Sequence, residues 1–248
     1  MWSYIRNLLT RKSQYIGELR VKSEQGDMSA LCDLGFCYQT GTGVEKNLEK
    51  AASLFRIAAE SGYAKAQCNL GGCYAKGEGV PVDHEQAVLW YRLAAEQKDA
   101  VAQFCLGLCY YLGDGVPTNI DMAVEWYQKS AEQGYAMAEY NIGACHANGE
   151  GVARDMNRAA IWYQKAAGHG NGDAQHNLGG CYILGEGVKR DFVKAYKWFD
   201  LADAQGVADA GKRRDMLAEQ LMTREQLDEA RRLAAAFVPE KDWAALNY

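Results

Sequence analysis

Hydrophobic positions along the chain follow a helical spacing. Between residues 64 and 76, the apolar residues fall on one side of a helix, at Ala66, Leu70, Cys73 and Tyr74. After Asp83, a second segment carries small and aromatic residues at the same kind of spacing, at Ala87, Trp90, Tyr91, Ala94 and Ala95. This pattern predicts two amphipathic helices joined by a short polar turn.

The helix pair recurs every 36 residues. A Leu-Gly or Ile-Gly dipeptide begins at positions 34, 70, 106, 142 and 178, and a Gly-x-Gly-Val tetrad begins at positions 41, 77, 113, 149 and 185. The first glycine of each tetrad stands where a helix ends, and a residue with positive φ is favoured there. A polar residue then precedes each second helix as its predicted N-cap. These N-caps are Asn47, Asp83, Asn119, Asp155 and Asp191.

Five in-phase copies predict an all-α solenoid, because a single helix pair cannot bury its own apolar face. The predicted repeats are 28–63, 64–99, 100–135, 136–171 and 172–207. Residues 1–27 are expected to form an N-terminal half-repeat cap, and residues 208–248 to form C-terminal capping helices and a tail. Within that end, Thr223 to Gln226 spell a capping box that opens a helix through Phe237, and Trp243 is expected to pack on that helix or to fray.

The motif Ala-x-x-x-Leu-Gly-x-x-Tyr, followed by Gly-x-Gly-Val and Ala-x-x-Trp-Tyr-x-x-Ala-Ala, resembles the Sel-1-like repeat family, which is related to the tetratricopeptide repeats. The resemblance covers about residues 28–207. It implies a right-handed α/α superhelix of antiparallel helix pairs, with first helices on the concave wall and second helices on the convex wall. It also implies a non-catalytic protein that binds other proteins.

Charge and composition give no indication of a nucleic-acid-binding, membrane-spanning or secreted protein. The 248 residues are 48% hydrophobic and 24% charged, with a net charge of −5. A mildly acidic chain gives no reason to expect nucleic acid or an anionic membrane as a partner. No apolar stretch approaches the roughly 20 residues that span a bilayer, and the start lacks a secretory signal. We therefore expect a cytoplasmic protein, or a periplasmic one if a leader has been removed.

Eight cysteines raise the possibility of disulfides or a metal site. Five of them share one phase on the first helices: Cys37, Cys73, Cys109, Cys145 and Cys181. Stacked helices lie about 9–10 Å apart, beyond the roughly 7 Å between Cα atoms that a disulfide allows. Some relatives bridge a cysteine on each helix of a pair, but here the second helices carry none. Free thiols in the core are therefore expected.

Metal ligation is the weaker alternative for two groups of residues. Cys105 and Cys109 share one helix face, and Cys145, His146, His176 and Cys181 form a loose group across two repeats. Acidic turn residues such as Glu78 are expected to be solvated rather than to bind Ca²⁺. No cofactor is expected.

Motifs for catalysis are absent from the sequence. It contains no Gly-x-Ser-x-Gly, no His-Glu-x-x-His and no phosphate-binding loop. The recurring glycines follow predicted helices rather than strands, so they are turns. We expect no enzymatic activity.

Candidate partner-binding residues come from the outward positions of the first helices. The third copy is the most apolar, and small residues in its neighbours would leave a hollow beside its rings, as in a groove for a peptide or a helix. The alternative is that the aromatic residues Phe104 and Tyr140 pack between adjacent first helices. The candidates in this row are Phe104, Leu108, Tyr111, Leu112, Tyr140, His176 and Ile183.

A second candidate row is polar. Asn69, Asn141 and Asn177 recur at one phase, and their amides suit either an extended peptide backbone or a bridge between turns of the stack. The leading function is an adaptor that binds a protein or peptide in its groove, as a monomer or in a partner-bound complex. The alternatives are an immunity protein that inhibits a toxic enzyme and, less favoured, a hydrolase of the disulfide-rich branch.

Overall fold

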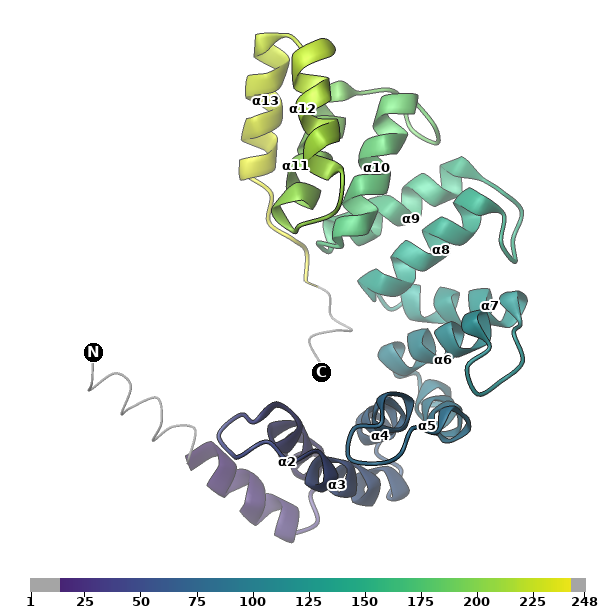
Figure 1. The fold of residues 1–248 in the computed structure, drawn as a ribbon, viewed down its shortest axis with the longest axis vertical. Coiled ribbons are helices and arrows are strands. Elements are labelled where there is room, and N and C mark those ends of the chain that lie inside the picture. The colour runs from purple at the N-terminus through teal and green to yellow at the C-terminus, as the bar shows by residue number, and fades with distance from the viewer. Residues whose placement is uncertain (1–13, 242–248) are drawn as a thin grey trace, which may run out of the picture. The chain divides into compact units, whose positions relative to one another are not determined.

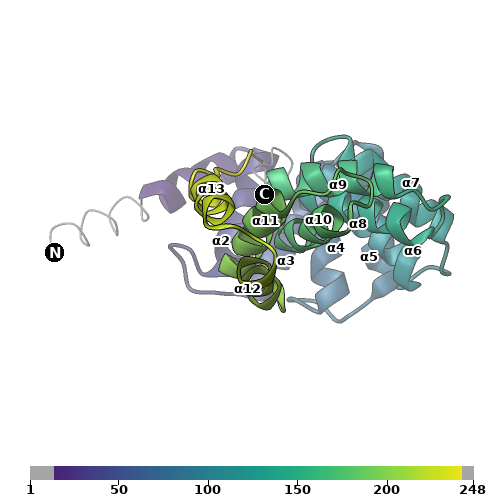
Figure 2. The ribbon, with the colours of Figure 1, turned by 90° about the horizontal axis from the view of Figure 1, so that it is seen from above.

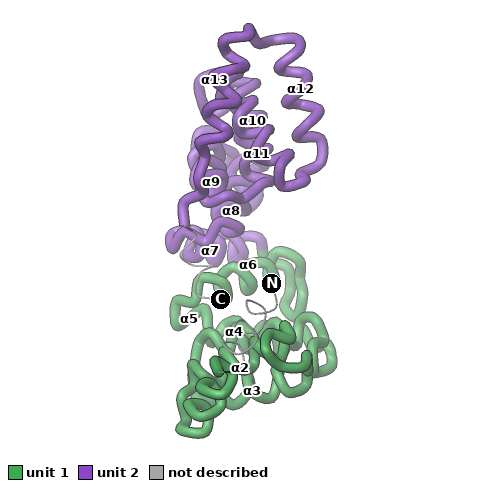
Figure 3. Tube along the Cα trace, turned by 90° about the vertical axis from the view of Figure 1, so that its left-hand side faces the viewer, with its two compact units in different colours: residues 1–119 green, residues 120–248 purple. Residues whose placement is uncertain are grey.

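The computed structural model describes residues 14–241, and these residues form helices and turns without any strand. They divide into two compact units, residues 1–119 and 120–248 (Figure 3). The helices appear in chain order in Figure 1. Unit 1 contains a helix over residues 14–24, then α2 (Met28–Thr40), α3 (Leu48–Glu60), α4 (Ala64–Lys76), α5 (His84–Glu96) and α6 (Ala100–Leu112). The all-α fold predicted from the repeats is therefore confirmed.

Unit 2 begins with the second helix of the third repeat and ends with the C-terminal helices. Its helices are α7 (Ile120–Ala131), α8 (Ala136–Asn148), α9 (Met156–Gly168), α10 (Gly172–Leu184), α11 (Phe192–Ala204), α12 (Ala210–Gln220) and α13 (Arg224–Ala235). Figures 1 and 2 both show α12 and α13 beside α11. Trp243 lies outside the described residues, so its predicted packing stays a prediction.

Helix ends follow the predicted chemistry. The five glycines that open the tetrads are all left-handed C-caps, at Gly41, Gly77, Gly113, Gly149 and Gly185. The side chains of Asn47, Asp83, Asp155 and Asp191 each accept a backbone N–H at the start of a second helix. Asp27, Asp99 and Asn171 cap first helices in the same way, which the sequence analysis did not anticipate.

In four of the repeats, the glycine of the Leu-Gly or Ile-Gly dipeptide lets an aromatic ring of the second helix approach the first helix. A Cβ atom on Gly71 would lie 2.8 Å from the ring of Tyr91, which is closer than real Cβ contacts come. Phe55, Tyr163 and Phe199 approach Gly35, Gly143 and Gly179 in the same way. The glycine therefore allows a ring to fill the space within the helix pair, where close packing is the rule.

The apolar core of each unit runs through its stacked pairs. In unit 1, Ile16 and Leu19 of the helix over residues 14–24 are buried with α2, α3 and α4, so this helix covers the end of the core. In unit 2, Leu217 of α12 is fully buried with α9, α10 and α11, and Phe237 packs against Trp198 with ring centroids 5.5 Å apart. Val44, Val80 and Val188 of the turns pack at the core edges.

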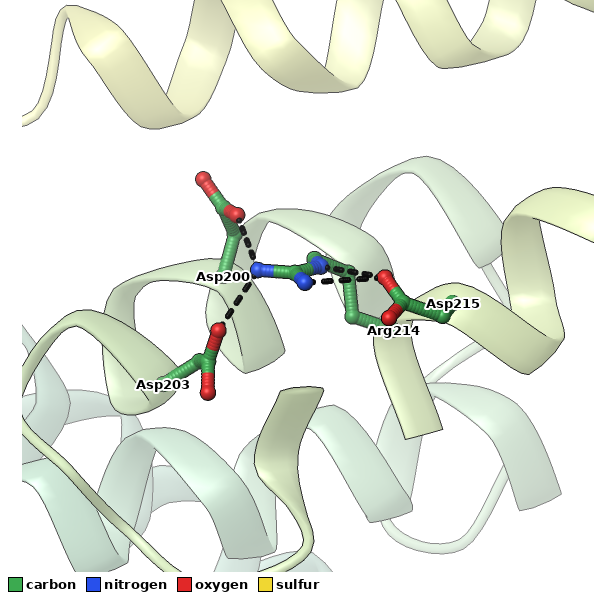
Figure 4. Close-up of polar contacts among 4 residues, drawn as sticks. All are labelled: Asp200, Asp203, Arg214 and Asp215. Atoms are coloured by element: carbon green, nitrogen blue, oxygen red, sulfur yellow. Dashed lines mark hydrogen bonds and ion pairs between the residues drawn. The ribbon is translucent and has the colours of Figure 1, made fainter. Parts of the chain in front are cut away.

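An ionic cluster joins the C-terminal helices. Arg214 of α12 contacts Asp200 at 3.0 Å and Asp203 at 2.7 Å, both on α11, and its Nε donates to Asp215 at 2.8 Å (Figure 4). Arg214 is partly buried, and its guanidinium contacts carboxylates of both α11 and α12. The cluster therefore serves the packing of α12 on α11.

The predicted capping box at Thr223 is confirmed. The Thr223 hydroxyl accepts from the Gln226 N–H at 3.3 Å, and the Gln226 side chain accepts from the Thr223 N–H at 3.0 Å. We expect Thr223→Ala to destabilise α13 by about 1 kcal/mol, because it leaves an N–H of the first turn without its acceptor. Amide hydrogen exchange in residues 224–235 should accelerate about fivefold, while exchange in α4 should not change. Equal protection of α13 in both proteins would contradict this expectation.

Candidate partner-binding surface

Successive first helices meet through a recurring contact of three residues, which we call the junction. Each junction contains one residue from a first helix, an aromatic residue 23 positions later on the second helix of the same repeat, and a residue 37 positions later on the first helix of the next repeat. In the first junction these are Cys32 of α2, Phe55 of α3 and Asn69 of α4. The amide Nδ2 of Asn69 donates to the Sγ of Cys32 at 3.4 Å, and Phe55 is fully buried. Asn69 therefore bridges two repeats.

A later junction in unit 2 uses Tyr140, Tyr163 and Asn177. The two tyrosine rings lie 6.1 Å apart between centroids. Burial raises the pKa of Tyr163 to about 12, and the hydrogen bond from Asn177 opposes this rise. Burial also raises the pKa of Tyr140, again against a hydrogen bond from Asn177. Asn177 is therefore bonded to its neighbours within the stack.

The last junction combines His176, Phe199 and Arg213. The His176 ring meets Phe199 edge-on, with centroids 5.4 Å apart. Burial, followed by the charge of Arg213, lowers the pKa of His176, so the neutral imidazole is favoured. This histidine is partly buried in the packing of α10 against the C-terminal helices.

The junctions account for several residues predicted to bind a partner. Asn69, Tyr140, His176 and Asn177 contact neighbouring repeats through the groups described above. Phe104 is buried, with 8% of its surface exposed, and Asn141 is partly buried. The amides of Asn69 and Asn177 form hydrogen bonds within the stack, to Cys32 and to Tyr140 and Tyr163 respectively. A role for these amides in binding a ligand stays a prediction.

Other predicted residues lie on the surface of unit 1. On α6, Tyr111 is 36% exposed, Leu112 is 56% exposed and Leu108 is partly buried. Phe36 of α2, at the phase of Leu108, is 45% exposed. Phe36 was not among the predicted residues, although it stands two repeat periods before Leu108.

Between these large side chains, α4 presents small ones. Gly72 occupies the phase of Phe36 and Leu108, and Ala75 occupies the phase of Tyr111. A Cβ atom on Gly72 would approach nothing but the Tyr91 hydroxyl, at 3.7 Å. We call this set the unit 1 apolar row, and its members are Phe36, Gly72, Ala75, Leu108, Tyr111 and Leu112. The surface of α4 therefore carries small residues at the positions where α2 and α6 carry bulky apolar side chains.

The corresponding apolar residues of unit 2 are fewer. Ile183 packs at the edge of the unit 2 core, whereas its neighbour Leu184 is 67% exposed. Ala144 and Ala147 of α8 stand at the phases of Leu108 and Tyr111. Large side chains therefore gather most densely on the first helices of unit 1.

The remaining candidate chemistry is dispersed. All eight cysteines are free thiols, and Cys105 and Cys109 are the partly exposed ones. Among the described residues, no three His, Cys, Asp or Glu side chains converge as ligands for a metal ion. His146 is buried, and its Nδ1 has no hydrogen-bond partner. In residues 14–241, no helix has both the length and the apolar character needed to cross a bilayer.

The family model of the Sel1 repeat matches residues 29–63, 64–99, 100–135, 136–171 and 172–207. The chain belongs to the Sel1 repeat family. Sel1 repeat proteins generally mediate protein–protein interactions, and their fold is typically a non-catalytic scaffold.

Solved Sel1 repeat structures resemble this chain. A Sel1 repeat protein from Oxalobacter formigenes is 34% identical, with a TM-score of 0.77 over 89% of this chain and 92% of its own. The protective antigen c5321 of uropathogenic Escherichia coli is 30% identical, with a TM-score of 0.59 over 95% of this chain and 59% of its own. This Sel1 repeat chain thus spans less than two thirds of that protein.

A third solved structure, the immunity protein Pa5087 of Pseudomonas aeruginosa, shares the fold at 21% identity. Its TM-score is 0.52 over 84% of this chain and 79% of its own. A search of curated proteins finds no match.

Proposed function

We propose that this protein is a non-catalytic scaffold that binds a protein or peptide partner through the unit 1 apolar row. The observation that carries the proposal is the exposure of Phe36, Tyr111 and Leu112 on either side of the small residues of α4. Interfaces bind most strongly where large apolar side chains surround a space that a partner side chain fills. A row of this kind suits an apolar anchor from a partner helix or extended segment.

The polar clusters of the described residues support a structural rather than a catalytic role. Arg214 is saturated by three aspartates. His169 is bonded to the buried Glu139 at 2.7 Å, and His176 packs on a phenylalanine ring. Neither histidine contacts a serine or cysteine in the pairing that activates a nucleophile. We infer that binding, without chemistry, is what this chain supplies.

The proposal is tested by quantitative affinity capture on the full chain. The test variant carries Tyr111→Asp and Leu112→Asp, which place two charges in the unit 1 apolar row. The control variant carries Ile57→Asp and Leu93→Asp on the second helices α3 and α5, where these side chains are 50% and 44% exposed. A partner retained by the original chain should bind the test variant at least tenfold more weakly, because buried charges without counterions are costly.

The control variant should retain the same partner with unchanged affinity, and both variants should melt within a few degrees of the original chain. Loss of binding in the control variant and not in the test variant would place the interface on the second helices and overturn the proposal. Binding measured by titration calorimetry with the purified partner gives the affinity for each chain.

A further inference from the structure

The segment that follows α13 crosses back over the helices of unit 2. Residues 237–240 form no helix, and Figure 1 shows them as the yellow coil that leaves α13. We call this segment the strap. It contacts α11 of the fifth repeat and then the end of α9 in the fourth repeat, so it joins the C-terminal helices to both.

The strap begins with an aromatic contact on α11. The Phe237 ring meets the Trp198 ring edge-on, with centroids 5.5 Å apart, and the Nζ of Lys197 lies 5.1 Å from the centroid of the Phe237 ring. Trp198 is 8% exposed and is more buried than the tryptophans at the same phase of the three preceding repeats. The surface of α11 therefore offers a ring and a cation to an aromatic side chain.

The strap ends at the C-terminus of α9. The N–H of Glu240 donates to the carbonyl oxygen of Gly168, the last residue of α9, at 2.9 Å. The last carbonyls of a helix have no partner within the helix, so the strap supplies one. The Glu240 carboxylate lies 3.9 Å from the Nε2 of His169, whose ring is positively charged when protonated. This end of α9 therefore accepts a backbone N–H and faces a carboxylate.

The residues that receive the strap are particular to the fourth repeat. At the phase of Gly168, the first three repeats carry glutamate, at Glu60, Glu96 and Glu132. A Cβ atom on Gly168 would lie 3.9 Å from Oε1 of Glu240, so a glutamate there would repel the carboxylate of the strap. His169 stands where the second, third and fifth repeats carry glutamine. The fourth repeat therefore suits an acidic segment better than its counterparts do.

Two side chains of the strap face solvent. Val238 is 80% exposed, and the side chain of Glu240 is 79% exposed. The strap therefore depends on its tether as well as on its contacts. A short tether gives an effective concentration of about 1 mM, so a free segment that makes the same contacts should bind with a dissociation constant of about 1 mM or below. A segment that adds contacts of its own would displace the strap.

We propose that the surface beneath the strap is a second binding surface, for a partner segment in which an aromatic residue precedes an acidic residue by three positions. We call it the strap surface, and its members are Lys197, Trp198, Gly168 and His169. The strap occupies this surface and withholds it from partners until one displaces it. The strap surface shares no residue with the unit 1 apolar row, so the two proposals succeed or fail separately.

The test uses the full chain and a fluorescein-labelled peptide that copies residues 236–241, Ala-Phe-Val-Pro-Glu-Lys. In the strap variant, Phe237→Ala and Glu240→Ala remove the ring and the carboxylate of the strap. Fluorescence polarisation should show that the peptide binds this variant about tenfold more tightly than the original chain, because it no longer competes with a tethered segment. Glu240→Lys alone, which keeps the Phe237 contact, should give a smaller gain in the same direction.

Matched substitutions in the strap variant locate the binding surface. Gly168→Glu introduces the residue of the first three repeats and should weaken binding of the peptide roughly fivefold, because two carboxylates then face each other. Gly180→Glu on α10 is the control, since a Cβ atom on Gly180 meets nothing within 4 Å, and it should leave binding unchanged. A peptide with lysine in place of glutamate should bind the Gly168→Glu chain more tightly than the copied peptide does.

Four results would overturn the proposal. Equal affinity for the original chain and the strap variant would show that the strap covers no binding surface. Equal losses from Gly168→Glu and Gly180→Glu would reflect only the added charge. Absence of binding to the strap variant at about 1 mM peptide would make the strap a part of the C-terminal cap alone. A dimer of the original chain that the strap variant loses, measured by sedimentation, would assign the surface to a second copy. Circular dichroism establishes that each variant is folded.

Discussion

Replacing Gly79 with alanine should lower the free energy of unfolding by about 3 kcal/mol or more. Gly79 is the second glycine of the tetrad in the second repeat, and its φ is +74°. A methyl group there would overlap the backbone carbonyl of Leu48, the first residue of α3 in the preceding repeat. Neither backbone can shift without disturbing the stacking of the two repeats.

Gly62→Ala is the matched control for this substitution. Gly62 has a φ of +89°, but a Cβ atom there would meet nothing within 4 Å. Its cost should be about 1 kcal/mol, the penalty of a left-handed conformation alone. Urea unfolding followed by circular dichroism measures both losses, and losses of equal size would show that the Leu48 contact contributes nothing.

The recurrence of glycine could be predicted from the sequence, but only part of its cause could. The first glycine of each tetrad was predicted as a helix C-cap, and the structure confirms it. The second was interpreted as a turn residue, whereas the structure shows that it packs directly against the backbone of the preceding repeat. Gly115 approaches His84 and Gly187 approaches Met156 in the same way. Contacts between repeats depend on how copies stack, which periodicity within one copy does not reveal.

For the outward face of the first helices, too, the sequence predicted the positions of residues but not their contacts between repeats. Sequence spacing placed Phe104, Tyr111 and Asn69 on outward positions, but it did not distinguish side chains between helices from side chains on the surface. In the structure Phe104 is buried and Asn69 bridges to Cys32, while Tyr111 is exposed. What decides burial is which residues of successive first helices meet. In the junctions these residues are 37 positions apart, one more than the 36-residue repeat.

A buried polar row also escaped the sequence analysis. Gln67, Gln103 and Gln175 recur near the start of first helices, and each donates to a carbonyl eight residues earlier, at 3.1–3.2 Å. Gln97 donates to Gln67 at 2.7 Å, and Gln205 donates to Gln175 at 2.8 Å. Helical spacing alone does not identify these glutamines as buried, and a buried amide with both groups bonded costs little.

In the fourth repeat this row is ionisable. Glu139 stands at the glutamine position with 2% of its surface exposed, and His169 stands in the place of Gln97 and Gln205. The Nδ1 of His169 lies 2.7 Å from the Glu139 carboxylate, and Nε2 lies 3.9 Å from Glu240. The two side chains thus replace an amide pair with a carboxylate and an imidazole at the same site.

His169→Ala should therefore destabilise unit 2 by about 3 kcal/mol, because it removes a hydrogen-bond partner from a buried carboxylate. The double variant Glu139→Gln, His169→Gln is the control, since it rebuilds the amide pair of the second and fifth repeats. Its stability should lie within about 1 kcal/mol of the original chain, since paired neutral groups satisfy each other. Chemical unfolding at pH 7 measures both. A loss below about 1 kcal/mol for His169→Ala would show that Glu139 does not depend on the imidazole. If instead the double variant is as unstable as His169→Ala, the amide pair is not interchangeable with the acid–imidazole pair, and the row is specific to each repeat.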